Sequence, residues 1–311
     1  MDDVMVGGLS LKEAYEKGGA AAMGSVIDLS QRAVQNDNIY RLKDLPAFQP
    51  PKVHRLGIPV LDDHFRLREG DFTVITGIPG HGKSTFINHV AGRMAEKHGW
   101  TTCFASFEQM PQIDHRRALR TYFNAKLEVH QSEEEKDRAD AWINRFFSFI
   151  VPNEEEDVSL DWTLEAAAAS VIRHKAKLVV IDPWNEMDHI RPRDMSLTEY
   201  TGYAIKAFRR MARLHKVHVI VAAHPAKQKK NEDGTYYTPT LYDISDSAHW
   251  YNKADIGIVV HRKDATTTLI RVAKSRYHDE IGTPGDVEAH FNREIGKYEI
   301  VEPEMRQIHG R

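Results

Sequence analysis

The sequence predicts an α/β fold: a mostly parallel β-sheet with helices on both faces, antiparallel strands at one edge and a helical arm at the N-terminus. Three observations support it. From about residue 53, nearly continuous apolar runs alternate with helical segments, as in parallel strands covered on both faces. A glycine-rich motif separates the first long apolar run from the first helix of this region. The last part of the chain has short strand-like segments joined by turns and little helix.

Composition and length set the limits. The chain has 311 residues, of which 41% are hydrophobic and 28% charged, which suits one large α/β domain with or without an appendage. No apolar run approaches the roughly 20 residues of a membrane span, and the acidic "MDDVMVGG" start has no secretory or transit pattern. Cys103 is the only cysteine, which excludes an intramolecular disulfide and a zinc ribbon. We therefore expect a cytoplasmic protein, in a bacterium or a phage-infected cell, that has no contact with a membrane.

The first 50 residues differ from the rest. The S-x-x-E pattern from Ser10 to Glu13 predicts a capped short helix, and residues 20–34 continue as a second helical piece. Residues 45–52, "LPAFQPPK", break any helix and read as a linker. We predict an N-terminal helical arm over 1–50 and one globular domain over 51–311. Helices that pack on their own core remain the alternative for the arm.

Within the globular domain the elements follow in order. Helices are expected from residue 83 and over 132–147, 160–175 and 196–216, where the last has Ala204, Phe208 and Met211 on one face. The apolar runs predict core strands over 71–77, 101–108, 147–152, 176–182 and 217–225. Shorter strands at 254–262, 267–276 and 287–292 fit antiparallel edge strands.

The motif "GIPGHGKS" fits G-x-x-x-x-G-K-[ST] without a mismatch. Glycines at such positions let main-chain N–H groups surround a phosphate chain, and the following helix N-terminus favours anions. Lys83 would reach the β- and γ-phosphates of ATP, and the Ser84 hydroxyl would bind Mg²⁺. The expected nucleotide-binding residues in this loop are Gly77, Gly80, Gly82, Lys83, Ser84 and Thr85.

Polar side chains end three of the predicted core strands. Asp182 follows "KLVVI", where a carboxylate would complete the Mg²⁺ site at the carboxyl edge of the sheet. Glu108 ends the strand after the phosphate-loop helix, where it would orient and deprotonate an attacking water. His224 ends the next strand and would contact the γ-phosphate. A hydrolytic base favours an ATPase over a small-molecule kinase, which must exclude water.

Six stretches together resemble a known family. They are "TGIPGHGKST", "FASFEQM", "LVVIDPWNE", "VIVAAHPAK", "YDISDSAHWYNKAD" and "VAKSRYHDEIGTPG". Their order resembles that of ring-shaped replicative helicases of the DnaB type, which have a RecA-like P-loop core, and in particular the Twinkle-like and phage primase-helicase branch. The resemblance covers roughly residues 50–300. It implies either a stand-alone helicase or the helicase part of a longer protein.

The resemblance also implies roles for residues near the C-terminus. Lys274 and Arg276 in "AKSR" match the strand whose cations reach the nucleotide of the adjacent subunit, where an arginine offered in trans stabilises transition-state charge. Arg262 and Phe291 match positions that sandwich the adenine base. A core phenylalanine is the competing interpretation for Phe291. A hexameric ring, 5′-to-3′ movement and replication partners such as a primase are further implications.

DNA contacts are expected from two loops that follow Asp182 and His224. Their basic residues are Arg191 and Arg193 in the first loop and Lys227, Lys229 and Lys230 in the second. The net charge of −3 excludes a generally basic surface, but several copies would gather these loops around single-stranded DNA. Asp246 departs from the family, which commonly has glycine there, and would weaken phosphate contact.

We therefore expect an ATP-dependent helicase that moves on single-stranded DNA. A RecA-like recombinase or clamp-type ATPase that does not unwind DNA is the first alternative. A P-loop small-molecule kinase is the second.

Overall fold

The computed structural model describes residues 5–6, 9–10, 13, 16–19, 40–226, 230–232, 234–245 and 248–301. The chain divides into two compact units, Met1–Pro50 and Pro51–Arg311. In the first unit, β1 (Met5–Val6) pairs antiparallel with β2 (Leu9–Ser10), and residues 13 and 16–19 are helical. Ser10 thus lies in a strand, which corrects the expected helix cap. The remainder of the expected helical arm lies outside the described residues, up to a short 3-10 turn, η1 (Leu42–Asp44).

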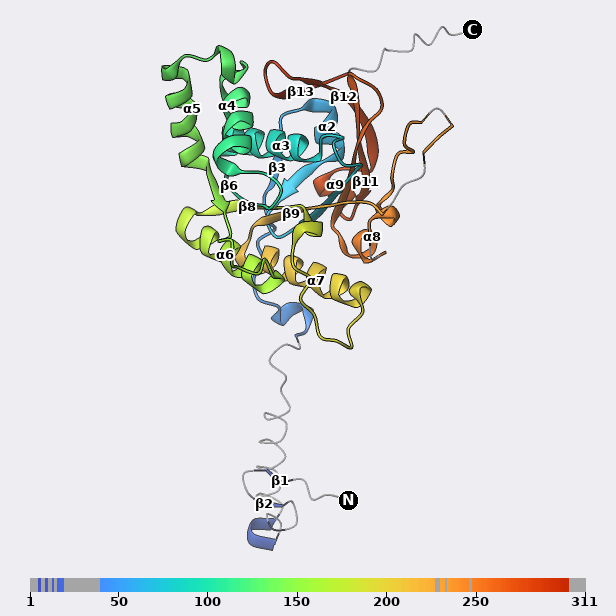
Figure 1. Ribbon diagram of the computed structural model, residues 1–311. Coiled ribbons are helices and arrows are strands. Elements are labelled where there is room, and N and C mark those ends of the chain that lie inside the picture. Colours follow the sequence, from blue (N-terminus) through green and yellow to red (C-terminus); the bar gives the residue numbers. More distant parts are fainter. Residues whose placement is uncertain are drawn as a thin grey trace, which may run out of the picture. The chain divides into compact units, whose positions relative to one another are not determined.

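The second unit is built on one large sheet (Figure 1). Its strand order is β13-β12-β11-β10-β5-β9-β8-β6-β7. The parallel strands are β5 (Phe72–Thr76), β6 (Thr101–Ser106), β7 (Phe147–Ile150), β8 (Ala176–Asp182), β9 (His218–Ala223) and β10 (Ile256–Arg262). Three antiparallel strands complete one edge: β11 (Thr267–Ser275), β12 (Gly285–Asn292) and β13 (Lys297–Ile300). The expected parallel sheet with antiparallel edge strands is confirmed. A separate two-stranded ribbon joins β3 (Val53–Arg55) to β4 (Arg66–Arg68).

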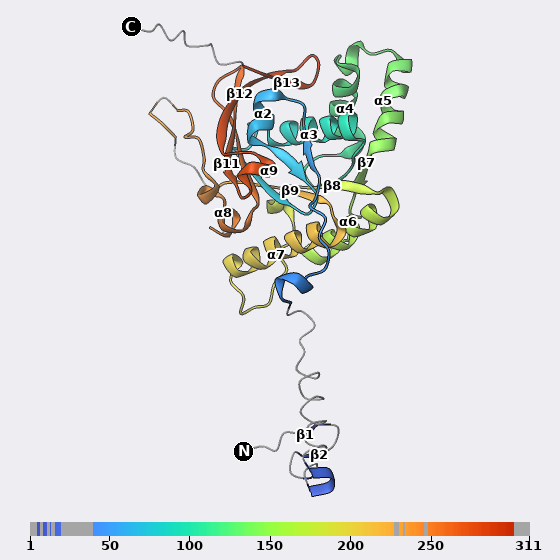
Figure 2. The ribbon, with the colours of Figure 1, turned by 180° about the vertical axis from the view of Figure 1, so that it is seen from behind.

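Helices cover both faces of the sheet. They are α2 (Pro59–His64), α3 (Lys83–His98), α4 (Arg116–Asn124), α5 (Glu133–Phe146), α6 (Leu160–His174), α7 (Leu197–His215), α8 (His249–Lys253) and α9 (His278–Ile281). Figures 1 and 2 show α3 and α4 on one side of the sheet and α6 and α7 on the other. Two cores result, because alternate strand residues face opposite sides: Val180 packs in the core of α3, and Val179 packs in the core of α7.

Local sequence explains where the long helices start. Ser132 and Ser196 each accept a hydrogen bond from a main-chain N–H three residues later, and Glu135 and Glu199 complete two capping boxes. The expected apolar face of α7 is buried against the sheet. None of the helices in the described part of the chain is both long and apolar enough to cross a membrane.

Candidate nucleotide-binding site

The candidate site lies at the carboxyl ends of four neighbouring parallel strands. In the sheet, β9 lies between β5 and β8, and β6 follows β8. At these ends Thr76 pairs with Ala223, and Ser106 pairs with Asp182. The phosphate loop, His224, Asp182 and Glu108 therefore leave the sheet from one edge, as ligand sites in open parallel sheets do.

The phosphate loop, residues 77–82, joins β5 to α3 and needs its glycines. Gly80 has φ +76°, a conformation that residues with a side chain rarely adopt. A Cβ on Gly77 would stand 2.0 Å from the main-chain oxygen of Val260 on β10. The Lys83 ammonium lies inside the loop and donates to the Gly77 oxygen at 2.9 Å. Burial lowers the pKa of Lys83, against the opposing effect of Asp182 and Glu108.

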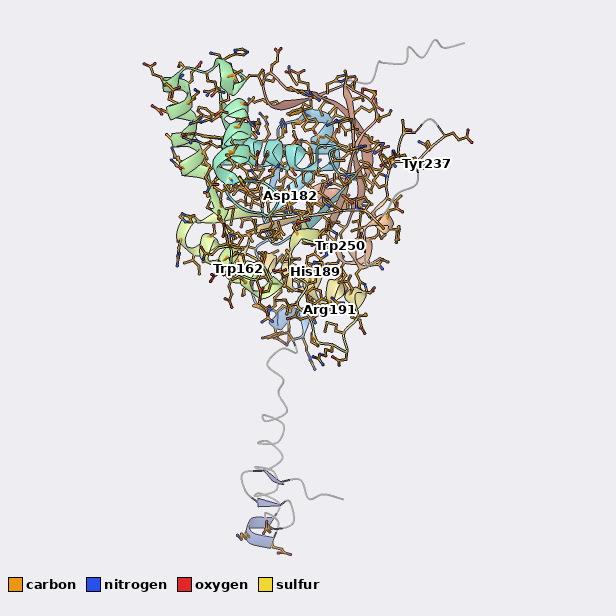
Figure 3. All side chains as sticks on the ribbon, in the orientation of Figure 1. Trp162, Asp182, His189, Arg191, Tyr237 and Trp250 are labelled. Atoms are coloured by element: carbon orange, nitrogen blue, oxygen red, sulfur yellow. The ribbon has the colours of Figure 1, made fainter. Side chains whose placement is uncertain are left out.

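Ser84 and Asp182 lie together beside this loop. Figure 3 labels Asp182 in the middle of the second unit, and 5% of the residue is exposed. Burial raises the pKa of Asp182, while a hydrogen bond with the Ser84 side chain and the charge of Lys83 lower it. A hydroxyl and a carboxylate side by side are the oxygen ligands that Mg²⁺ prefers, so the residues fit the expected metal. In the described residues, no separate cluster of three His, Cys, Asp or Glu side chains offers another metal site.

Glu108 and His224 lie on either side of Asp182 in the strand order. Glu108 is exposed, and its pKa is raised by partial burial and by the charges of Asp182 and Glu186. His224 is half-buried, and burial together with the nearby charge of Lys83 lowers its pKa to about 4. At neutral pH the imidazole is therefore uncharged and can both donate and accept a hydrogen bond.

Asn185, which the sequence analysis did not assign, connects two of these strand ends. It lies in η4 (Trp184–Glu186), directly after β8, and its Oδ1 accepts the main-chain N–H of His224 at 2.7 Å. Trp184 is fully buried and stacks on His189 with ring centroids 4.3 Å apart, which fixes this turn to the core (Figure 3). The only sequence signal was the stretch "DPWNE", which contributed to the resemblance without a role for its asparagine.

Arg262 and Phe291 come together beside the phosphate loop. Both line a pocket that also includes Thr85 at the start of α3 and Tyr298 on β13. The Phe291 and Tyr298 rings lie 5.0 Å apart. A cation and aromatic rings next to Thr85 suit a nucleotide base. Tyr298 was missed, because nothing in the sequence indicates that β13 returns to the phosphate loop.

A second cavity, of about 340 Å³, connects the phosphate loop to the segment 234–245. His81, at the tip of the loop, lies 5.0 Å from His261 and 6.5 Å from Tyr236, measured between ring centroids. The exposed Lys230 lies over the Tyr236 ring at 5.1 Å. The segment that carries one expected DNA-contacting lysine thus touches the phosphate loop.

Lys274 and Arg276 lie far from this protomer's own phosphate loop. Arg276 N–H donates to the oxygen of Asp255, whereas Gly77 meets Val260, five positions further along β10. At about 3.3 Å per residue, the two places are about 17 Å apart along the strand. Arg276 also donates to main-chain oxygens at the end of α8 and to Asp255, and Lys274 donates to those of Tyr251 and Asn252. Partial burial lowers the pKa of Lys274 to about 8.

The expected DNA-binding residues do not form one surface within the chain. Arg191 and Arg193 are exposed in the loop before α7. Figure 3 shows Arg191 beside α7 and Tyr237, near Lys230, at a distant edge of the same unit. Lys227, Lys229 and Asp246 lie outside the described residues.

Comparisons with known proteins agree with this geometry. The family described as "AAA domain" matches residues 60–230. The chain is 35% identical over 252 residues to the Twinkle homolog protein, chloroplastic/mitochondrial, of Arabidopsis thaliana, which covers 76% of this chain and 35% of that protein. A structure described as a DnaB-like replicative helicase with its primase interactions has a TM-score of 0.64 at 16% identity, over 92% of this chain and 73% of that one. Another solved ATPase domain also gives 0.64 at 18% identity, over 91% and 99%.

The fold and the site define a P-loop nucleotide-binding domain of the RecA-like type. The chain belongs to the AAA domain family. Within that family, the resemblance to Twinkle-like and DnaB-type helicase domains that the motifs indicated is confirmed.

Proposed function

We propose that this protein is an ATP-dependent replicative DNA helicase that moves along single-stranded DNA as a hexameric ring and hydrolyses ATP between subunits. The similarity to a Twinkle homolog and to a DnaB-like replicative helicase supports the class of activity. The same similarity favours 5′-to-3′ movement and a primase as a partner. Residues 1–50 would serve as the arm that holds adjacent subunits together.

One observation carries the ring in this proposal: Arg276 and Lys274 lie at the opposite edge of the sheet from the phosphate loop of their own chain. A strand distance of about 17 Å exceeds what an arginine side chain spans. A cation placed there can serve a nucleotide only on another protomer. Head-to-tail contacts of this kind close into rings, so that every site receives an arginine from its neighbour.

The remaining site residues take the roles that their positions favour. Lys83 and the main-chain N–H groups of the loop bind the phosphates, and Ser84 and Asp182 would hold Mg²⁺, which neutralises phosphate charge. Glu108 accepts a proton from the attacking water, and its raised pKa improves it as a base near neutral pH. Arg262 and Phe291 hold the base.

A forked-duplex unwinding assay with ATP and Mg²⁺ tests the proposal. We expect strand separation by the wild-type protein and none by Lys83→Ala, which should lose ATP turnover. Arg276→Ala should bind nucleotide normally and hydrolyse it at least about 1000-fold more slowly. DNA-coated filaments without strand separation would instead indicate a recombinase, and phosphate transfer to a small acceptor without stimulation by DNA would indicate a kinase. Full turnover by Arg276→Ala would disprove hydrolysis between subunits.

A further inference from the structure

A single buried carboxylate, Asp255, holds Arg276 in place. The residue is 3% exposed and lies between α8 and β10. Its Oδ1 pairs with the Arg276 Nε at 3.2 Å and with a guanidinium nitrogen of Arg209 on α7 at 3.1 Å. Because a buried carboxylate needs such partners to remain charged, the three side chains fix one another.

The same residue is also bonded to the first residue of β5. Asp255 Oδ2 accepts the N–H of Phe72 at 3.0 Å, and Asp255 N–H donates to the Phe72 oxygen at 2.9 Å. The Asp255 oxygen in turn accepts the Arg276 N–H at 2.9 Å. Asp255 therefore joins the arginine on one side to the strand that leads into the phosphate loop on the other.

We propose that Asp255 is the positioning residue for Arg276: it sets where the guanidinium stands for the neighbouring protomer's nucleotide. This inference rests on the proposed function, in which Arg276 acts in trans. Asp255 does not touch the nucleotide itself. Because Phe72 and Arg276 share this carboxylate, the β5 strand of one site is tied to the arginine offered to the next site.

Asp255→Asn tests the proposal with little change in shape. The amide oxygen can still accept the Phe72 N–H, but its NH₂ group then faces two guanidinium groups, which are also donors. We expect kcat for ATP to fall about 10- to 100-fold with KM and the melting temperature nearly unchanged, because misplacing a transition-state group by about 1 Å has effects of this size. Arg209→Gln is the matched control: it removes the other partner of the same oxygen, and kcat should stay close to wild type. An equal loss in Arg209→Gln would overturn the positioning role.

Mixing experiments separate this inference from the proposed function. Lys83→Ala protomers have an intact Arg276, so an Asp255→Asn site beside one of them regains a well-placed arginine. Random mixing in equal amounts should restore about a quarter of wild-type turnover, since about a quarter of the interfaces pair the two intact halves. Arg276→Ala mixed with Lys83→Ala serves as the reference. Rescue of Arg276→Ala without rescue of Asp255→Asn would overturn the positioning role, whereas rescue of neither would overturn the trans-acting site itself.

A second variant covers the case in which Asp255→Asn does not fold. Asp255→Glu keeps the charge and lengthens the side chain by one methylene, which moves the carboxylate relative to Arg276. A lower kcat that Lys83→Ala protomers rescue would support the proposal. Wild-type kcat in Asp255→Glu alone, or a loss that mixing does not rescue, would overturn it.

Discussion

Acid should destabilise the second unit through His218, the first residue of β9. The side chain is completely buried; its Nε2 lies 2.8 Å from the Thr73 hydroxyl, and its Nδ1 lies 2.9 Å from the Arg68 oxygen. A carbonyl oxygen only accepts, so Nδ1 carries the proton and Nε2 accepts from the hydroxyl, which defines a neutral imidazole. Burial lowers the pKa of His218 from 6.5 to about 4, against the opposing effects of the Arg68 hydrogen bond and Asp255.

The sign and size of the effect follow from these two pKa values. Between about pH 4 and 6.5 the unfolded chain binds a proton on His218 and the folded chain does not, so stability falls as the pH falls through this window. Between pH 7 and pH 5, this residue alone should lower the free energy of unfolding by about 2 kcal/mol.

Urea unfolding at the two pH values measures this contribution. The wild type and His218→Asn, which can still donate to the Arg68 oxygen, are compared at each pH. The variant starts less stable because it loses a buried ring, but its loss between pH 7 and pH 5 should be smaller by about 2 kcal/mol. The other buried histidines titrate in both proteins and cancel in the comparison. An equal loss in both proteins would show that the His218 pKa is not lowered by folding.

Three further substitutions test the site. Asn185→Ala leaves the His224 N–H without its acceptor, which costs about 1–3 kcal/mol; we expect stimulation of ATP turnover by single-stranded DNA to fall, and Asn185→Asp, which keeps the acceptor, to retain more of it. Gly77→Ala forces a Cβ against the Val260 oxygen and should weaken nucleotide binding about 10- to 100-fold in a fluorescent-nucleotide titration, and unchanged affinity would contradict the loop geometry. Phe291→Ala should weaken binding of the same nucleotide about 10-fold, whereas Phe291→Tyr should not, and equal losses would remove Phe291 from the base pocket.

The strand-end residues of the site could be predicted because each depends on local sequence. A parallel strand that ends in a polar residue places that residue at the carboxyl edge, whichever strands lie beside it. The phosphate loop, Asp182, Glu108 and His224 were found in this way. The strand order was not predictable from local pattern, because β9 enters between β5 and β8 although it follows β8 in the chain.

Helix α4 shows why other parts were missed. Its sequence, "RRALRTYFN", has no continuous apolar stripe, so periodicity does not predict it. In the fold, Arg116 and Arg120 both pair with Asp140 on α5, and these ion pairs fix the helix to its neighbour. Asn185 was missed for a related reason: its bond joins residues 39 positions apart, and only the folded sheet brings them together.

Two side-chain contacts at opposite ends of the sheet give the proposed ring a physical route between sites. Asn185 joins the strand ends that carry Asp182 and His224, and Asp255 joins the other end of β5 to Arg276. Between these ends β5 is buried at all five residues, and close-packed strands move as units rather than by gradual deformation. A shift of the phosphate loop would therefore displace Phe72, Asp255 and Arg276 together. The moving arginine belongs to the next site, so turnover at one interface would alter the geometry of its neighbour without any contact between the two nucleotides.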